Sequence, residues 1–197
     1  METSTVAIYK KLEQSGVKFV DYAYLTLLTG VTNQNTLYKI VTRLVEKDIL
    51  KPLIDGKYVL INSNPTDFEI ANYIYNPSYI SLESALSYYG ILAQFPYTTT
   101  SITTKKSNVY KITAKEYTFS QIKKDFFNGY EMIDGFLIAT AEKAVFDLIY
   151  FSLKGVVKID FKDLDLSSVD IKKLESMIIA SNDERMINKF KKINNDR

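Results

Sequence analysis

Two groups of side chains in this sequence have types and spacings that could do chemistry. Asp163 and Asp165 are spaced like a pair of metal-binding carboxylates, and carboxylate oxygens suit Mg²⁺. Their neighbours read as a polar loop that enters a helix, so we expect no metal site there. The second group is a helical face of amides, hydroxyls and cations within residues 29–47. Such side chains reach base edges and phosphates, which is the chemistry of DNA recognition.

The composition narrows the catalytic alternatives. The 197 residues include no cysteine and no histidine, which excludes disulfides, thiolate metal sites and most Ser-His or Cys-His catalysis. The seven glycines are scattered singly, without a glycine-rich phosphate loop. Glu142 and Lys143 could act as an acid–base pair, but their place in the first turn of an apolar helix favours compensation of the helix dipole. We therefore predict a protein that is not an enzyme and that has no cofactor or bound metal.

Residues 29–47 carry the most informative pattern in the chain. Apolar side chains recur there at helical spacing, at Leu37, Ile40, Val41, Leu44 and Val45. This stripe can be buried, which leaves the polar face exposed. A helix that merely faces solvent would more often carry Glu/Lys pairs than amides, threonines and a tyrosine. The predicted DNA-contacting residues, on this helix and on the hairpin after it, are Thr32, Asn33, Gln34, Asn35, Tyr38, Lys39, Thr42, Arg43, Lys51 and Lys57.

Two further helices are expected to position this one. Residues 3–14 read as a first helix, and residues 20–28 supply a second helical stripe. Thr32 or Asn33 would cap the third helix, since both are favourable N-cap residues. The three helices together could form a small core.

A hairpin is predicted directly after the third helix. Strand-like runs at residues 50–53 and 57–61 flank Asp55 and Gly56, which is a strong hairpin signal. The order helix, tight turn, helix, hairpin is that of a winged helix-turn-helix. Such a unit can bind duplex DNA or can serve protein contacts, and the polar face favours DNA.

A polar break at residues 62–66 divides the sequence. We predict a winged helix-turn-helix domain at residues 1–61 and a mixed α/β domain at residues 67–197. The fold class is accordingly α+β.

The second part starts with helical signals and continues with strands. Residues 67–75 read as a short helix, and Ser81 would cap a helix that Gly90 ends. Strand-prone runs follow at residues 97–104, 109–112, 116–119, 130–133 and 136–139. A turn at residues 105–108 predicts that the second run returns against the first.

Residues 140–153 form the most apolar helical segment. Thr140 is a natural N-cap, and Lys143 can pair with Asp147 at i,i+4. A helix that is apolar nearly all round is expected to be buried. Beyond it the sequence predicts a strand at 156–161, amphipathic helices at 168–179 and 182–193, and a frayed tail at 194–197.

A second basic patch is predicted between residues 105 and 124. Its lysines are Lys105, Lys106, Lys111, Lys115, Lys123 and Lys124. A lysine-rich surface that contacts only solvent would give the same pattern, and both interpretations stay open.

Tyrosines crowd the start of the second part. They are Tyr73, Tyr75, Tyr79, Tyr88, Tyr89 and Tyr97. Aromatic side chains among basic residues can stack single-stranded bases. Few lysines lie between these tyrosines, so a core of phenol rings with hydrogen-bonded hydroxyls is the favoured interpretation.

The hydropathy pattern shows no membrane segment. No apolar run reaches the roughly 18–20 residues that a membrane-spanning helix needs. The first residues lack a positive region followed by an apolar one, so no secretory signal is visible. We expect a cytoplasmic protein without a membrane partner.

Two stretches of the second part resemble a known family. The first stretch comprises Pro77, Ser78, Tyr79, Ile80, Ser81, Leu82, Glu83, Ser84, Ala85, Leu86, Tyr89 and Gly90. The second comprises Ile138, Ala139, Thr140, Ala141, Glu142, Lys143, Ala144, Asp147, Leu148, Ile149 and Tyr150. In this order, behind a winged helix, they resemble the AbiEi family, the antitoxins of abortive-infection (type IV) toxin–antitoxin systems. The resemblance covers residues 3–155 and leaves the C-terminal helices unmatched.

The resemblance implies a protein with two roles and no enzymatic activity. The winged helix would bind double-stranded DNA at inverted repeats in its own promoter and repress its operon. The second domain would neutralise a nucleotidyltransferase-like toxin, with a stable complex between the two proteins not assumed. The family's toxins carry a Gly-Ser pair before spaced aspartates, and no such pair precedes Asp163. The alternative is a winged-helix interaction module, or a regulator of another defence operon, that acts by protein contact.

Overall fold

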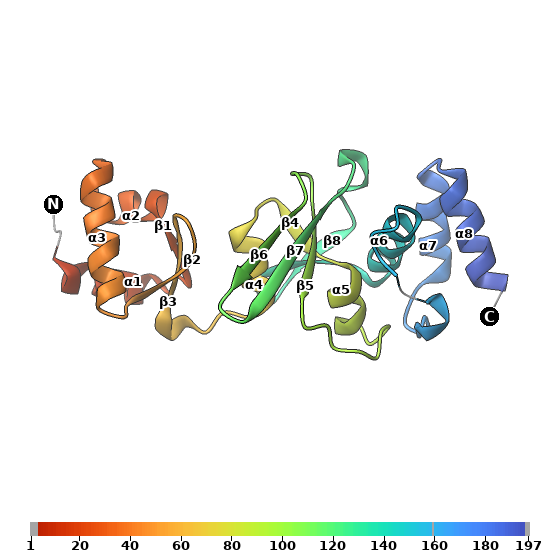
Figure 1. Ribbon diagram of the computed structural model, residues 1–197, viewed down its shortest axis with the longest axis horizontal. Coiled ribbons are helices and arrows are strands. Elements are labelled where there is room, and N and C mark those ends of the chain that lie inside the picture. The colour runs from red at the N-terminus through yellow and green to blue at the C-terminus, as the bar shows by residue number, and fades with distance from the viewer. Residues whose placement is uncertain (1–3, 159, 196–197) are drawn as a thin grey trace. The chain divides into compact units, whose positions relative to one another are not determined.

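The computed structural model describes residues 4–158 and 160–195 and has an α+β fold (Figure 1). The chain divides into two compact units, Met1–Thr66 and Asp67–Arg197. Each unit has its own sheet and its own buried side chains.

The first unit combines three helices with a small antiparallel sheet. In chain order its elements are α1 (Thr5–Ser15), β1 (Phe19–Asp21), α2 (Tyr22–Thr29), α3 (Gln34–Glu46), β2 (Leu50–Ile54), β3 (Lys57–Leu60) and η1 (Ile61–Ser63). The sheet order is β1-β3-β2. The helices contact one another and enclose a core that includes Ile8, Leu12, Leu25, Ile40 and Leu44.

The third helix and the hairpin agree with the sequence pattern. Asn33 caps α3, because its side-chain oxygen accepts a hydrogen bond from the Thr36 backbone N–H at 3.1 Å. Leu37 and Ile40 on the apolar stripe are buried. Gly56 has a φ of 71°, the left-handed conformation that the tight turn between β2 and β3 requires.

The start of the second helix was wrongly predicted. Residues 19–21 form strand β1, and Val20 pairs with Tyr58 of β3. The helix begins only at Tyr22, because the Asp21 carboxylate caps it by accepting from the Tyr24 N–H at 2.7 Å. The apolar spacing of residues 20–28 fits a helix, and this cap is what stops the helix from extending to Val20.

The second unit is built on a six-stranded mixed sheet. Its helices are α4 (Asp67–Ile74), α5 (Leu82–Tyr88), η2 (Lys124–Phe126), α6 (Ala141–Leu153), η3 (Phe161–Asp163), α7 (Ile171–Ala180) and α8 (Glu184–Asn195). Its strands are β4 (Ser78–Ile80), β5 (Thr99–Thr103), β6 (Asn108–Ile112), β7 (Lys115–Gln121), β8 (Tyr130–Ile133) and β9 (Phe136–Ala139). The sheet order is β6-β7-β5-β4-β9-β8.

The predicted pairing of the second strand was wrong. The sequence suggested that β6 returns against β5, but β6 pairs antiparallel with β7, and β5 pairs parallel with β7. The reason is a tight turn at Thr113 and Ala114, where Thr113 adopts a left-handed φ of 55°. Asp134 and Gly135 join β8 and β9 in the hairpin that the sequence predicts.

The C-terminal region is helical. Residues 156–158 and 160 form no strand, in contrast to the prediction for 156–161, and residue 159 lies outside the described residues. Instead the Asp160 carboxylate accepts from the Lys162 N–H and starts η3. Asp170 caps α7, which therefore begins later than predicted.

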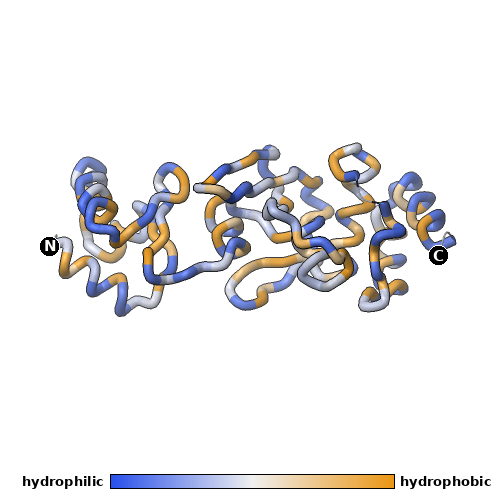
Figure 2. The backbone as a smooth tube through the Cα atoms, turned by 60° about the horizontal axis from the view of Figure 1, so that its bottom comes forward, coloured by the Kyte–Doolittle hydropathy of each residue, from blue (hydrophilic) through white to orange (hydrophobic). Residues whose placement is uncertain are grey.

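The last helix, α8, is amphipathic, as its sequence predicts. Its buried residues are Met186, Phe190 and Ile193. Figure 2 shows hydrophilic and hydrophobic segments alternating along this helix near the C label. Asn194 and Asn195 continue the helix, and the rest of the predicted frayed tail lies outside the described residues.

In residues 4–158 and 160–195, we find no helix with the length and apolar character needed to cross a membrane.

Candidate functional site

The outer face of α3 carries the predicted DNA-contacting residues of the helix. The side chains of Gln34, Asn35, Tyr38, Lys39 and Arg43 are exposed, with Tyr38 at 64%. Within the described residues, no intramolecular hydrogen bond or ion pair engages the side chains of Gln34, Asn35 or Lys39. These two amides and one ammonium are therefore available to an external partner.

Three other predicted residues make hydrogen bonds within the helix or its cap. The side-chain oxygen of Asn33 is used in the helix cap, where it also accepts from the Thr36 hydroxyl at 3.3 Å. The Thr42 hydroxyl donates to the Tyr38 carbonyl at 3.0 Å, and Arg43 Nε donates to the Lys39 carbonyl at 3.2 Å. Thr32 is exposed and precedes the cap.

The two lysines predicted on the hairpin differ in their surroundings. Lys51 lies on β2 and is exposed. Lys57 lies on β3, is half-buried and already interacts within the protein. Lys51 is therefore the better placed of the two for a phosphate contact.

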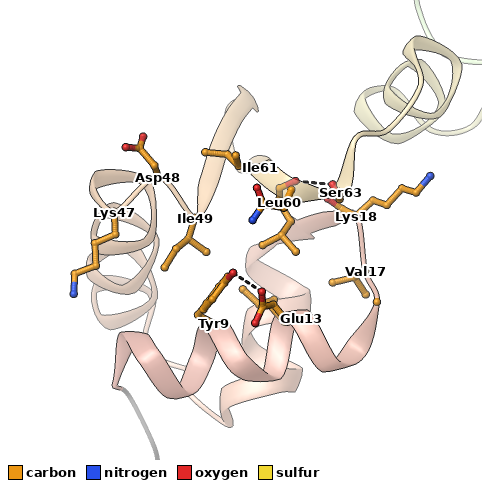
Figure 3. Close-up of a pocket in the computed structure, with 13 residues that line it drawn as sticks. Tyr9, Glu13, Val17, Lys18, Lys47, Asp48, Ile49, Leu60, Ile61 and Ser63 are labelled. Atoms are coloured by element: carbon orange, nitrogen blue, oxygen red, sulfur yellow. Dashed lines mark hydrogen bonds between the residues drawn. The ribbon is translucent and has the colours of Figure 1, made fainter.

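A separate hollow of about 600 Å³ lies elsewhere on the first unit (Figure 3). Leu12, Ile49 and Leu60 give it an apolar lining. The Tyr9 hydroxyl donates a hydrogen bond to the Glu13 carboxylate, and this bond raises the pKa of Tyr9. None of the predicted DNA-contacting residues lines this hollow.

In the second unit, the structure brings the two family-like stretches together. Their first stretch supplies β4 and α5, and their second supplies the end of β9 and α6. Ile80 of β4 lies opposite Ile138 of β9 in a parallel pair. Asp147 of α6 accepts hydrogen bonds from the hydroxyls of Tyr79 at 3.0 Å and Ser81 at 2.8 Å.

A buried ion pair completes this network. Lys143 Nζ lies 2.6 Å from Asp147 Oδ1, as the i,i+4 spacing predicts, and both side chains are fully buried. Lys143 Nζ also donates to the Phe126 carbonyl at 2.7 Å. Burial raises the pKa of Asp147, although the Lys143 ammonium and the two hydroxyls oppose that shift. Because no member of the pair reaches solvent, the network acts as an internal brace of the fold.

Ser81 is not the helix cap that the sequence predicts. It stands at the N-cap position of α5, but its side chain makes no capping hydrogen bond. Its hydroxyl is committed to Asp147, which lies 66 positions later in the sequence. Thr140 does cap α6, by accepting from the Lys143 N–H at 3.3 Å.

Glu142 has a different partner from its neighbour Lys143. Its carboxylate accepts from Lys173 Nζ of α7 at 2.8 Å and lies near the Asp170 N–H at 3.4 Å. Burial opposes ionisation, but the hydrogen bond from Lys173 and those of nearby groups hold the pKa of Glu142 below its ordinary value. Glu142 therefore ties α6 to α7, which explains it without an acid–base role.

The six predicted patch lysines divide between the two ends of β7. Thr103 of β5 lies opposite Gln121 of β7, so the lysines that follow these strands share one end of the sheet. These are Lys105, Lys106, Lys123 and Lys124, and all four are exposed. Lys111 and Lys115 flank the turn at the other end, where they pair with Glu116 at 3.5 Å and Asp67 at 3.1 Å. The predicted single patch is therefore two groups.

The tyrosines of the second unit do not share one environment. Tyr79 is fully buried and stacks on Tyr130 with ring centroids 4.8 Å apart. Tyr75 is half-buried; its ring packs against Phe119, and its hydroxyl donates to the Lys106 carbonyl at 2.7 Å. Tyr88 and Tyr97, by contrast, are 44% and 67% exposed. The core interpretation is thus correct for Tyr79, holds only in part for the half-buried Tyr75, and is wrong for the two exposed rings.

Asp165, one of the two aspartates of the metal hypothesis, makes hydrogen bonds with backbone groups. Asp165 Oδ1 accepts from the Ser167 N–H at 2.9 Å, and the Asp165 N–H donates to the Ile91 carbonyl at 2.9 Å. Within residues 4–158 and 160–195, no group of three or more acidic side chains could hold a metal ion.

Comparison of the sequence with protein-family models and with curated proteins found no match.

Two tyrosines beside the exposed face of α3 could not be identified from local sequence patterns. Tyr22 and Tyr58 come from α2 and β3, and their rings meet edge to face with hydroxyl oxygens 3.4 Å apart. Burial, helped by the Tyr22 hydroxyl, raises the pKa of Tyr58, so the Tyr58 hydroxyl keeps its proton near pH 7. No spacing rule links positions so far apart.

Proposed function

We propose that the first unit is a winged helix-turn-helix that binds duplex DNA. The order α1-β1-α2-α3-β2-β3 supports this assignment, with α3 as the recognition helix and the β2–β3 hairpin as the wing. The observation that carries the proposal is the exposed face of α3, where the side chains of Gln34, Asn35 and Lys39 have no hydrogen-bond or ion-pair partner among the described residues. Amides suit base edges, and the ammonium suits phosphates.

Exposed cations on α3 and on the wing also support binding of this surface to DNA. Lys39 and Arg43 lie one turn apart along α3, and Lys51 is exposed on the wing. Such side chains fix the position of a protein on the DNA backbone, whereas the amides read sequence. The protein's net charge of +2 makes this local arrangement more informative than the overall charge.

We further propose that the protein is a type IV antitoxin that represses its own operon. The two AbiEi-like stretches support this role, because they meet in the brace formed by Tyr79, Ser81, Lys143 and Asp147. That buried brace joins the two stretches within one fold. The second unit would counter a nucleotidyltransferase-like toxin, and the protein would act in the cytoplasm.

A second candidate function is protein contact without DNA reading. One observation favours it: Phe95 is 93% exposed beside the exposed Tyr97, in the connection between α5 and β5. Large exposed aromatic side chains are enriched at protein interfaces. In this alternative the protein would inhibit or recruit a partner through the second unit.

Separate expression of the two units distinguishes these functions. If residues 67–197 alone rescue cells that express a nucleotidyltransferase-like toxin encoded beside this protein's gene, and residues 1–66 alone bind DNA, the protein is both antitoxin and regulator. If residues 67–197 rescue cells but the full chain binds no DNA, the protein-contact alternative is correct.

The regulator proposal is tested by measuring whether the protein binds the DNA upstream of its own gene. A labelled duplex of that region should shift with the full chain, and the shift should weaken steeply as salt increases. Absence of a salt-sensitive shift would contradict the regulator role and leave the antitoxin role to the rescue experiment.

A further inference from the structure

A small hollow lies on the same side of α3 as the proposed DNA contacts. Its lining consists of Tyr22, Gln34, Asn35, Leu37 and Tyr38, and its volume is about 390 Å³. The two rings and Leu37 supply apolar surface, while the two amides supply hydrogen-bonding groups. The lining includes no charged side chain.

The Tyr22 side of the hollow packs against the β2–β3 hairpin. The Tyr22 ring meets the Tyr58 ring edge to face, with centroids 6.2 Å apart. On the turn of the hairpin, Gly56 is so close that an added Cβ would lie 3.7 Å from the Tyr22 ring. A fixed aromatic wall favours a preformed binding surface over one that must be ordered on binding.

The chemistry of the lining points to a base pair and argues against a phosphate. A phosphate would need a cation in the hollow, and the cations of this helix, Lys39 and Arg43, do not line it. In the major groove, thymine presents the one apolar group, its methyl, and adenine pairs well with Gln or Asn amides. An A·T pair therefore matches both halves of the lining.

We infer that this hollow reads an A·T base pair, with the thymine methyl between Tyr22 and Tyr38 and the adenine edge against Gln34 or Asn35. The inference rests on the proposed DNA-binding function and names the base pair that this part of the surface selects. Lys39 and Arg43 anchor the backbone and contribute no preference at that position.

The test starts by selecting bound duplexes from a random-sequence pool with the full chain. Each thymine of the selected site is then replaced in turn by deoxyuridine, which removes only the methyl. At one position the dissociation constant should rise about fourfold, as expected for losing the burial of one methyl group. In the Tyr38→Ala variant, the thymine and deoxyuridine duplexes should bind equally well.

Matched variants separate base reading from anchoring. Gln34→Ala or Asn35→Ala should remove roughly tenfold of the preference for A·T at that same position. Lys39→Ala should weaken binding to all duplexes alike and leave the preference intact. Tyr38 is exposed and alanine favours helices, so the Tyr38→Ala variant is expected to fold.

Two outcomes would overturn the inference. One leaves the DNA-binding proposal intact, and the other overturns that proposal as well. If the chain selects DNA but the deoxyuridine scan is flat, the hollow does not read thymine, and the DNA-binding proposal stands. If no duplex is bound in a salt-sensitive way, both the proposed function and this inference fail.

Discussion

At the residue scale, the Lys143–Asp147 pair shows how a buried charge can be tolerated. Removing two ions from water is costly, and their mutual attraction compensates only when the remaining polar groups are also satisfied. Here Asp147 accepts from Lys143, Tyr79 and Ser81, and Lys143 donates in addition to the Phe126 carbonyl. The pair thereby joins α6, β4 and η2 at one point.

Breaking this pair should strongly destabilise the protein. Lys143→Met leaves the Asp147 carboxylate buried without its counter-ion, so the free energy of unfolding should fall by about 3–5 kcal/mol. Urea unfolding followed by circular dichroism measures the change. Lys172→Met, at an exposed position of α7, is the matched control and should change stability by less than about 0.5 kcal/mol. Equal effects of the two substitutions would contradict the bracing role.

The Glu142–Lys173 pair predicts a dependence of stability on acid pH. The pKa of Glu142 is lower in the folded chain than its ordinary value of 4.5, so the pair's contribution is fully present above that pH. The contribution is lost as the pH falls through the folded value, because the unfolded chain then binds the proton more readily. Lys173 is 53% exposed, which limits the effect to at most about 1 kcal/mol. In Glu142→Gln this step of the stability–pH curve should disappear; an unchanged curve would show that the pair contributes nothing.

At the element scale, α3 depends on its cap for the position of its first turn. Asn33→Ala should lower the free energy of unfolding by about 1 kcal/mol, because the Thr36 N–H loses its acceptor. Asn35→Ala is a close control, since Asn35 is exposed within the helix and alanine has the higher helix propensity. It should leave stability unchanged or slightly increased in the same urea titration. If Asn35→Ala is the more destabilising of the two, the cap assignment is wrong.

Elements governed by local rules could be predicted from the sequence. The helix α3, the hairpin at Gly56 and the buried helix α6 follow from periodicity, turn residues and caps. Strand β1 could not be predicted, because its partner is β3, which lies more than thirty positions later. The parallel pairing of β5 with β7 was missed for the same reason, since strand order is a long-range property.

The candidate site also combines features that local sequence predicts with features that depend on long-range contacts. The exposed residues of α3 could be predicted because one helix presents them. The hollow beside them could not, since its wall comes from Tyr22 and is held by Tyr58 on a distant strand. Likewise the i,i+4 spacing indicated the pairing of Lys143 with Asp147, but not the contribution of Ser81.

At the scale of the whole molecule, the chain consists of two units with separate cores. The first encloses Ile8, Leu25 and Leu44, and the second encloses Tyr79 and Leu148. Under the proposed function, the first unit would bind DNA and the second would act on a different partner.

Separate cores predict that residues 67–197 fold without the first unit. The isolated fragment should unfold cooperatively in urea, with a midpoint close to that of the same unit in the full chain. Near-ultraviolet circular dichroism of its many tyrosines reports the tertiary packing. A fragment that lacks this signal would contradict the assignment of an independent core.

The central claim, that α3 binds duplex DNA, is tested most directly by the salt dependence of binding. Affinity for the duplex DNA upstream of the protein's own gene should be measured from low to physiological salt. Three proteins are compared: the native chain, the double variant Lys39→Ala/Arg43→Ala, and the control Lys10→Ala on α1. The native affinity should fall steeply with salt, and the double substitution should reduce the slope of log K against log salt by about two, whereas Lys10→Ala should leave it unchanged. Equal slopes and affinities for all three proteins would contradict the claim.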